Sequence, residues 1–177
     1  MLAANNGAWN KPPGRVSWSE SQLEQARELL AAYADHDVFG FKDPRVLLVL
    51  EGWKQVCPQL QFVGVFRHPN AVARSLANRD EMPREQALAL WYRYNKVLYR
   101  QHRNKPFPLL CFDESEGEFR QKLDALILRL GLQELSSEQY FYDEQLRTSN
   151  AELDQALPWR VRRLYRKLLQ RSASQDE

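Results

Sequence analysis

The stretch that decides the fold is Phe62-Val63-Gly64-Val65-Phe66, and Arg67-His68-Pro69 follows it directly. Apolar residues and one glycine occupy both faces of this run, as is typical of a strand buried inside a parallel sheet. The apolar run ends abruptly at Arg67-His68-Pro69. The stretch predicts a buried strand at 62–66 and a helix that starts directly after it, over about residues 70–78.

Working outward from this stretch, short apolar runs alternate with helical patterns along the chain. Two more runs predict buried strands, at 38–41 and at 108–112. Apolar residues at helical spacing predict helices at 19–35, 46–56, 83–103, 117–130 and 158–171. Strands that alternate with helices pair in parallel with right-handed crossovers, so the expected fold class is α/β. Three strands are few, because such a sheet typically has about four to six.

Length and composition predict one globular domain. The chain has 177 residues, of which 44% are hydrophobic and 27% are charged, within the usual size of one domain. We expect this domain to span 1–171, with an irregular lead-in at 1–17 and a disordered tail at 172–177. Residues 132–156 are expected to form a polar, partly ordered excursion. No apolar run reaches the length of a membrane span or of a signal peptide, so we expect no membrane span and a cytoplasmic location.

Charge and cysteine content exclude several classes of site. The chain carries 25 Lys plus Arg and 23 Asp plus Glu, a net charge of +2, which gives no global reason to expect a nucleic-acid partner. Cys57 and Cys111 have no partners at metal-ligand spacing, and the three histidines lie far apart. We therefore expect buried thiols and no metal site.

Polar residues follow each predicted strand at the point where it ends. They are Lys42-Asp43-Pro44-Arg45, then Arg67-His68-Pro69, then Asp113-Glu114. In an open α/β sheet, ligands bind at the carboxyl ends of the strands. Two of the three sets bring cations there, beside helix N-termini that also attract anions. A phosphate-like ligand is the natural expectation.

Arg67 and Ser75 are the candidate pair for this phosphate. A guanidinium offers a planar fork for two phosphate oxygens, and a hydroxyl in the next helix can donate a further hydrogen bond. The alternative is structural: Arg67 pairs with a carboxylate, and Ser75 donates to a carbonyl of its own helix. Spacing alone does not decide between these interpretations.

The segment 67–79, Arg67-His68-Pro69-Asn70-Ala71-Val72-Ala73-Arg74-Ser75-Leu76-Ala77-Asn78-Arg79, resembles the 3′-phosphate-binding segment of the sulfotransferases that use 3′-phosphoadenosine 5′-phosphosulfate. Phe41-Lys42-Asp43-Pro44-Arg45, with Trp53 and Pro58, is similar to the preceding segment of bacterial members, including those associated with glycan sulfation. Residues 90–95 and 112–114 fall where the family has its long helix and its aromatic-acidic strand end. The resemblance covers roughly residues 9–132.

This resemblance implies a P-loop-type, three-layer α/β/α fold with a parallel sheet. It also implies transfer of a sulfuryl group from that donor to a hydroxyl or amine of a small-molecule or glycan acceptor, without a metal. Arg67 and Ser75 would hold the 3′-phosphate, and Lys42 would steady charge on the leaving group. Asp43 is a candidate general base; its alternative role is to cap a helix before Pro44.

The chain departs from the family in its phosphosulfate loop. Members have a strand, a Gly-rich basic loop and a helix at their start, whereas the seven glycines here are scattered. We therefore expect that the first strand-loop-helix unit is missing, and that the chain self-associates through the uncovered sheet edge. Phe112 stands where many members have tyrosine. The basic loop that closes over the 3′-phosphate in animal cytosolic members is also missing, and Arg147 is expected to be an exposed loop residue.

Two alternatives to a sulfotransferase follow. One is a non-catalytic remnant that binds a nucleotide or a protein partner. The other is binding of nucleic acid or of an acidic surface by the six cations of the last predicted helix. Leu164 and Leu168, four residues apart, indicate instead that one face of this helix docks on the core and leaves the arginines solvated.

Overall fold

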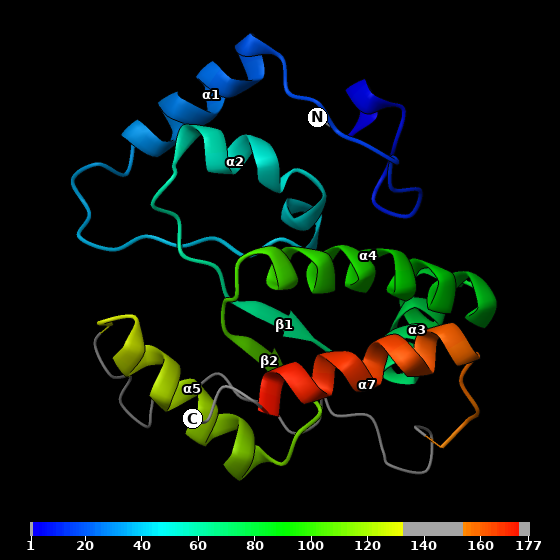
Figure 1. Ribbon diagram of the computed structural model, residues 1–177. Coiled ribbons are helices and arrows are strands. Elements are labelled where there is room, and N and C mark those ends of the chain that lie inside the picture. Colours follow the sequence, from blue (N-terminus) through cyan, green and yellow to red (C-terminus); the bar gives the residue numbers. More distant parts are fainter. Residues whose placement is uncertain (1, 133–153, 174–177) are drawn as a thin grey trace. The chain divides into compact units, whose positions relative to one another are not determined.

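The computed structural model describes residues 2–132 and 154–173 (Figure 1). Contacts within the chain define two compact units, residues 1–61 and 62–177. The prediction of one domain over 1–171 stays a prediction, because compact units also occur within single domains. Most of the predicted excursion at 132–156, including Arg147, lies outside the described residues.

The first unit contains two α-helices and two 3₁₀ helices. Their bounds are η1 Ala3–Asn5, α1 Glu20–Ala31, η2 Pro44–Leu48 and α2 Leu50–Val56. Helix α1 starts where the sequence predicts, because Ser19 and Gln22 form a reciprocal capping box. It ends four residues before the predicted end at Asp35. Helix α1 packs on α2 and buries Leu23 and Ala26.

The predicted strand at 38–41 is wrong. These residues form neither strand nor helix, and the Val38 side chain is 61% exposed. Aromatic contacts within the unit take the place of a sheet: the Phe39 ring stacks on Tyr33, and the Phe41 ring lies 4.9 Å from that of Trp53. The predicted helix at 46–56 is divided into η2 and α2.

The second unit holds a parallel two-stranded sheet, which confirms two of the predicted strands in shorter form. The predicted burial of the first strand on both faces is wrong, because Val65 is 54% exposed while Gly64 and Phe66 are buried. Strand β1, Gly64–Phe66, pairs with β2, Leu109–Cys111, with Gly64 opposite Leu109 and Phe66 opposite Cys111. Helices α3, Pro69–Asp80, and α4, Arg84–Asn104, connect the two strands. Helices α5, Glu116–Arg129, and α7, Trp159–Ala173, complete the unit. The described chain is therefore a mixed helix and sheet structure, compatible with α/β.

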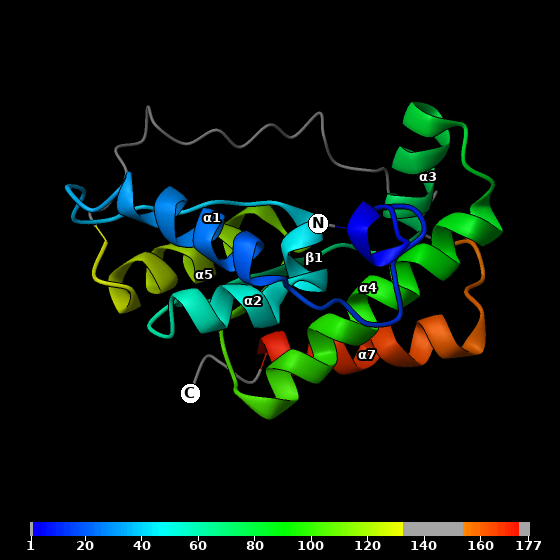
Figure 2. The ribbon, with the colours of Figure 1, turned by 90° about the horizontal axis from the view of Figure 1, so that it is seen from above.

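Helices pack against the sheet chiefly at β2. Helix α4 packs on α3 and on α7, and both α5 and α7 contact β2 (Figures 1 and 2). The predicted docking face of α7 is confirmed, because Val161, Leu164 and Leu168 are buried. The predicted tail is wrong at its first two residues: α7 continues through Ser172, which is buried, to Ala173. Residues 174–177 lie outside the described part.

The end of α5 follows the sequence prediction. Gly131 has a φ of +66°, a backbone conformation that glycine adopts without strain. Its N–H donates to Leu128 O, and the N–H of Leu132 donates to Ile127 O. This pattern is the Schellman motif.

Two further findings concern the described residues as a whole. Cys57 and Cys111 are buried thiols, as expected. Within residues 2–132 and 154–173, no group of three or more His, Cys, Asp and Glu side chains is arranged to hold a metal ion, and no helix is long and apolar enough to cross a bilayer.

Candidate functional site

An ion pair joins the carboxyl ends of the two strands. Arg67 follows β1 directly, and Asp113 lies two residues beyond β2. The Nε and Nη2 atoms of Arg67 donate to Asp113 Oδ1 at 3.4 and 3.2 Å. The second carboxylate oxygen of Asp113 accepts the backbone N–H of His68. The carboxylate pairing that the sequence left open for Arg67 is therefore present, and Asp113 positions this arginine.

Two aromatic residues complete the setting of Arg67. Its guanidinium carbon lies 4.7 Å from the centroid of the Phe112 ring, within the range of a cation–π contact. The indole Nε1 of Trp91 donates to Arg67 O at 3.0 Å. The Arg67 side chain keeps 27% of its surface exposed, against 9% for Asp113. Arg67 is thus held from several sides and still reachable by an anion.

The first turn of α3 lies directly beside this ion pair. His68 is its N-cap, and its Nδ1 accepts the backbone N–H of Asn70 at 3.2 Å. Asn70 is buried: its Oδ1 accepts from Arg84 Nη2 at 3.0 Å, and its Nδ2 donates to Gln155 O at 2.7 Å. Side chains from distant parts of the sequence therefore fix the start of α3, where backbone N–H groups favour anions.

Acidification is expected to destabilise this helix start. Burial lowers the pKa of His68 below its usual value, and the negative charge of Asp113 opposes this shift. The Tyr165 ring, which also contacts the His68 ring, is uncharged at neutral pH. The folded state then binds fewer protons than the unfolded state, so stability is complete above about pH 6.5 and falls as the pH drops through the folded pKa. Protonation of Nδ1 also removes the acceptor for Asn70.

Urea unfolding at pH 7.5 and pH 5.0 measures this effect. The control variant is His68→Asn, because asparagine also caps helices and does not titrate. The wild type is expected to lose more stability on acidification than His68→Asn. Equal losses in the two proteins would contradict the role of His68 as a neutral cap.

Two groups near the site, buried Cys111 and half-buried Tyr165, stay uncharged at neutral pH. The Tyr165 ring lies 4.9 Å from the His68 ring, and its hydroxyl hydrogen-bonds the Cys111 thiol. Burial raises the pKa of Cys111 to about 11 and also raises the pKa of Tyr165. Neither group supplies a nucleophile or a base, so the ionic chemistry of this edge belongs to Arg67 and Asp113.

Ser75 lies on the exposed surface of α3, in its second turn. Its hydroxyl has no hydrogen-bond partner among the described residues, so the predicted alternative of a bond to its own helix is not seen there. Ser75 lies about 9 Å along the helix axis from Pro69, at 1.5 Å per residue. Arg67 lies two residues before α3 and Ser75 lies in the second turn of this helix; both have exposed surface, but no hydrogen bond joins them.

Lys42 and Asp43 belong to the first unit, whereas Arg67 and Ser75 belong to the second. Lys42 is exposed. Asp43 caps η2 by accepting the N–H of Arg45 at 2.7 Å, and the Arg45 guanidinium contacts both carboxylate oxygens. Hydrogen bonds from Arg45 lower the pKa of Asp43, which makes its carboxylate a weaker base. The capping role that the sequence offered as the alternative is present.

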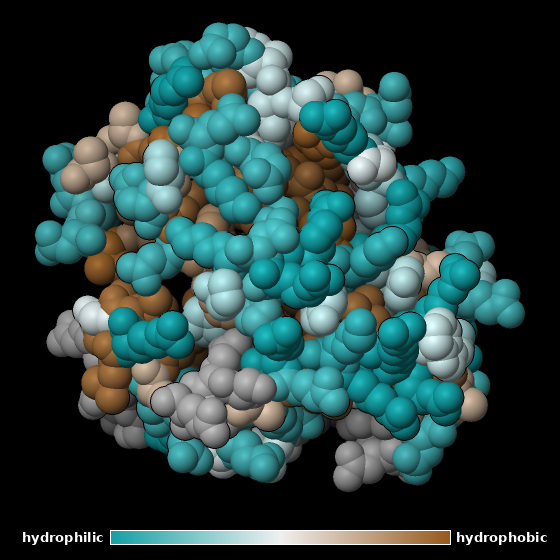
Figure 3. All heavy atoms as spheres, viewed as in Figure 1, coloured by the Kyte–Doolittle hydropathy of each residue, from teal (hydrophilic) through white to brown (hydrophobic). Residues whose placement is uncertain are grey.

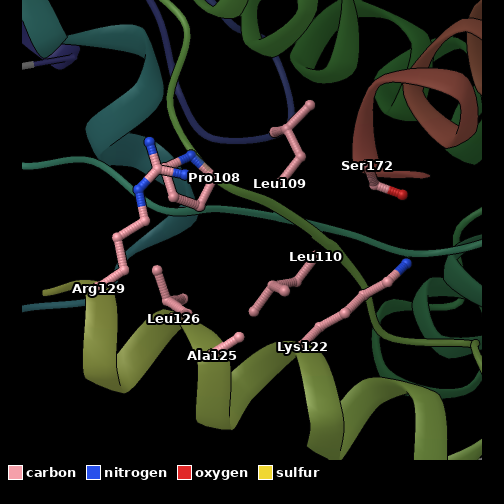
Figure 4. A pocket seen from close by; sticks show the side chains of 8 residues that line it. All are labelled: Pro108, Leu109, Leu110, Lys122, Ala125, Leu126, Arg129 and Ser172. Carbon is pink, nitrogen blue, oxygen red and sulfur yellow. The ribbon is translucent and has the colours of Figure 1, made fainter. Parts of the chain in front are cut away.

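One cavity of the second unit is too small for a nucleotide. It has a volume of about 70 Å³ and lies among β2, α5 and the end of α7 (Figure 4). Leu109, Leu110 and Leu126 line it, with the polar ends of Lys122 and Arg129. Small-molecule sites usually measure about 300–1,000 Å³. The Arg67 edge therefore remains the candidate site.

Sequence reasoning missed the residues that support this edge. Asn70, Arg84 and Tyr165 approach it from three helices, and no spacing pattern in the sequence pairs them. Glu114 is also part of the second unit, where it pairs with Lys122 at 2.8 Å. The sequence indicated only Asp113 and Glu114 as residues of this edge, because they follow a predicted strand.

Comparison of the chain with protein-family models, with curated proteins and with solved structures finds no match. The basis for a functional proposal is therefore the chemistry of the Arg67 edge.

Proposed function

We propose that the chain is a sulfotransferase-like protein that binds 3′-phosphoadenosine 5′-phosphosulfate and transfers its sulfuryl group to a hydroxyl or amine acceptor. Arg67 and Ser75 bind the 3′-phosphate of this donor. The observation that carries the proposal is the placement of Arg67 at the carboxyl end of β1, oriented by Asp113 and Phe112 and still partly exposed.

A phosphate at this edge meets complementary groups. The guanidinium offers charge-assisted hydrogen bonds, the start of α3 adds partial positive charge, and the Ser75 hydroxyl can donate from the second turn. Asp113 carries a negative charge that repels a phosphate. It is nearly buried and already accepts hydrogen bonds from Arg67 and from His68 N, so it orients the fork more than it repels the ligand.

The catalytic part of the proposal rests on fixed charge and positioning, as in phosphoryl transfer. Lys42 steadies negative charge on the leaving group, and Asp43 is the candidate base. The lowered pKa of Asp43 makes this second assignment the weaker one. The acceptor is a small molecule or a glycan.

The fold in this proposal is a P-loop-type α/β/α fold without its first strand-loop-helix unit. Two observations support it: the described sheet has two strands, and Val65 in the middle of β1 is 54% exposed. A strand apolar on both faces is normally covered on both. The same exposed surface supports self-association, which light scattering measures.

The alternative is a non-catalytic remnant that binds a nucleotide or a protein partner. The scattered glycines favour it, because no Gly-rich loop is present to cradle the 5′-phosphosulfate. Incubation with radiolabelled donor and a panel of hydroxyl and amine acceptors separates the two. Labelled product indicates an enzyme, whereas nucleotide binding without product indicates the remnant.

Calorimetric titration with adenosine 3′,5′-bisphosphate tests the phosphate site. Arg67→Ala is expected to weaken binding about 10–100-fold, because hydrogen bonds to charged groups contribute about 1.5–3 kcal/mol. Arg67→Lys keeps the charge but loses the fork-shaped guanidinium, so its affinity for the bisphosphate should fall between those of the wild type and Arg67→Ala. Ser75→Ala removes one neutral donor and is expected to weaken binding about fivefold.

Arg79→Ala is the matched control, because Arg79 is an exposed arginine near the end of the same helix and pairs with Asp80. It should bind like the wild type. Adenosine 5′-phosphate, which lacks the 3′-phosphate, should bind the wild type and Arg67→Ala equally weakly. If the bisphosphate also binds both proteins equally, the site is not at Arg67.

A further inference from the structure

The outward face of α7 is strongly basic. Helix α7 has 15 residues and no acidic one; its cations are Arg160, Arg162, Arg163, Arg166, Lys167 and Arg171. A hollow of about 230 Å³ lies on this helix. We call its lining the basic face: Trp159, Arg162, Arg163, Arg166, Lys167 and Gln170. The surface over α7 in Figure 3 is largely hydrophilic.

Helical geometry directs the basic face away from the core. The buried residues of α7 are Val161, Leu164, Leu168 and Ser172. At about 100° per residue, they lie on the side of the helix opposite the basic face. The apolar face of α7 is thus packed against protein and is not available to insert into a lipid bilayer, which argues against a membrane as the ligand of this helix.

The cations of the basic face contact aromatic rings. The guanidinium carbon of Arg163 lies 5.2 Å from the Trp159 ring, and Lys167 Nζ lies 5.4 Å from the Tyr99 ring. Within the ranges 2–132 and 154–173, no carboxylate forms an ion pair with Arg162, Arg163, Arg166 or Lys167. Since the whole chain has a net charge of only +2, this helix concentrates positive charge that its described neighbours leave unbalanced.

We propose that the basic face of α7 binds single-stranded nucleic acid. Proteins bind such strands with cations that follow the phosphates and with aromatic side chains on which bases stack. Trp159 is 60% exposed and supplies the stacking surface. Arg162 and Arg166 are one turn apart, about 6 Å along the axis, and contact successive phosphates. The proposal is independent of the phosphate site at Arg67, because the two share no residue.

The sequence alone favoured solvated arginines and no nucleic-acid partner. Two features of the structure change this interpretation. The arginines on one side of α7 line a common hollow, and an exposed indole lies within it. A charged face that serves only solubility needs neither feature.

The test is fluorescence anisotropy of a labelled 20-nucleotide single strand with the full chain, at 50 to 200 mM salt. If each of the four cations of the basic face contacts one phosphate, the logarithm of the binding constant should fall with the logarithm of the salt concentration with a slope of about −3, at about 0.7 per contact. The double variant Arg162→Gln/Arg166→Gln is expected to bind at least about tenfold more weakly, with a slope shallower by about 1.4. Trp159→Ala is expected to weaken binding about tenfold through lost stacking, and Trp159→Phe less.

Arg160→Gln/Arg171→Gln is the matched control, because both arginines are exposed on the same helix but outside the hollow. It removes the same charge and should weaken binding about twofold at most. Equal losses in the two double variants, with no effect of Trp159→Ala, would overturn the proposal in favour of a diffuse cationic surface. Absence of binding at 50 mM salt would also overturn it, as would tighter binding to heparin or to anionic phosphatidylserine vesicles than to the strand.

Discussion

Replacing Asp113 by alanine is expected to lower the free energy of unfolding by about 3 kcal/mol, because the change removes a nearly buried carboxylate that accepts hydrogen bonds from a guanidinium and from the backbone. Asp113 is 9% exposed and accepts from both Arg67 and the backbone N–H of His68. The variant removes this shared acceptor and, with it, the link between the ends of β1 and β2. Urea unfolding followed by tryptophan fluorescence measures the change.

The matched control for Asp113 is Asp80→Ala. Asp80 also pairs with an arginine, Arg79, at 2.9 Å, but that arginine is 65% exposed, and exposed pairs contribute about 0–1 kcal/mol. The double variant Arg67→Ala/Asp113→Ala should lose less stability than the two single variants added together, since each removes the same interaction. Additive losses would show that the ion pair does not couple the strand ends.

The same variant separates stability from binding. If Asp113 orients Arg67 for phosphate, Asp113→Ala should weaken adenosine 3′,5′-bisphosphate binding at temperatures where the protein is still folded. Unchanged affinity in the folded variant would mean that the guanidinium needs no such support.

The sequence predicted the elements whose signals are local. Helices α3, α4, α5 and α7 appear within a few residues of their predicted bounds, because apolar periodicity, prolines and a C-terminal glycine mark them in the chain itself. The prediction of a strand at 38–41 was wrong because it also rested on a local signal alone. Its four residues satisfy a local pattern, but a strand also needs a partner, and the aromatic rings of Phe39 and Phe41 find Tyr33 and Trp53 instead.

The candidate site shows the same difference between local signals and long-range contacts. Arg67 was identified from its place after a buried run, and the structure keeps it at the end of β1. Its pairing with Asp113 spans 46 residues, and the contacts of Asn70 with Gln155 span 85. Such pairs depend on how helices pack, which spacing in one sequence does not encode. The pairing with Asp113 is also the contact that orients Arg67.

Replacing Gly52 by alanine is expected to destabilise the first unit by about 3 kcal/mol, at the upper end of the cost of overpacking. A Cβ at this position would lie 2.0 Å from Cε2 of Trp18. The indole is rigid and is held by a hydrogen bond from its Nε1 to Val49 O at 3.1 Å and by edge contact with Trp53. Accommodating the methyl group therefore displaces the ring and breaks this bond.

The opposite sign is expected for Gly117→Ala, which is the control for backbone effects. Gly117 lies in the first turn of α5, and a Cβ there meets no atom within 4 Å. Since alanine reduces the conformational entropy of the unfolded chain, this variant should be more stable by about 0.5 kcal/mol. Urea unfolding of both variants distinguishes the two mechanisms. A Gly52→Ala protein as stable as the wild type would show that Trp18 does not pack over α2, and that α1 and α2 are held together in some other way.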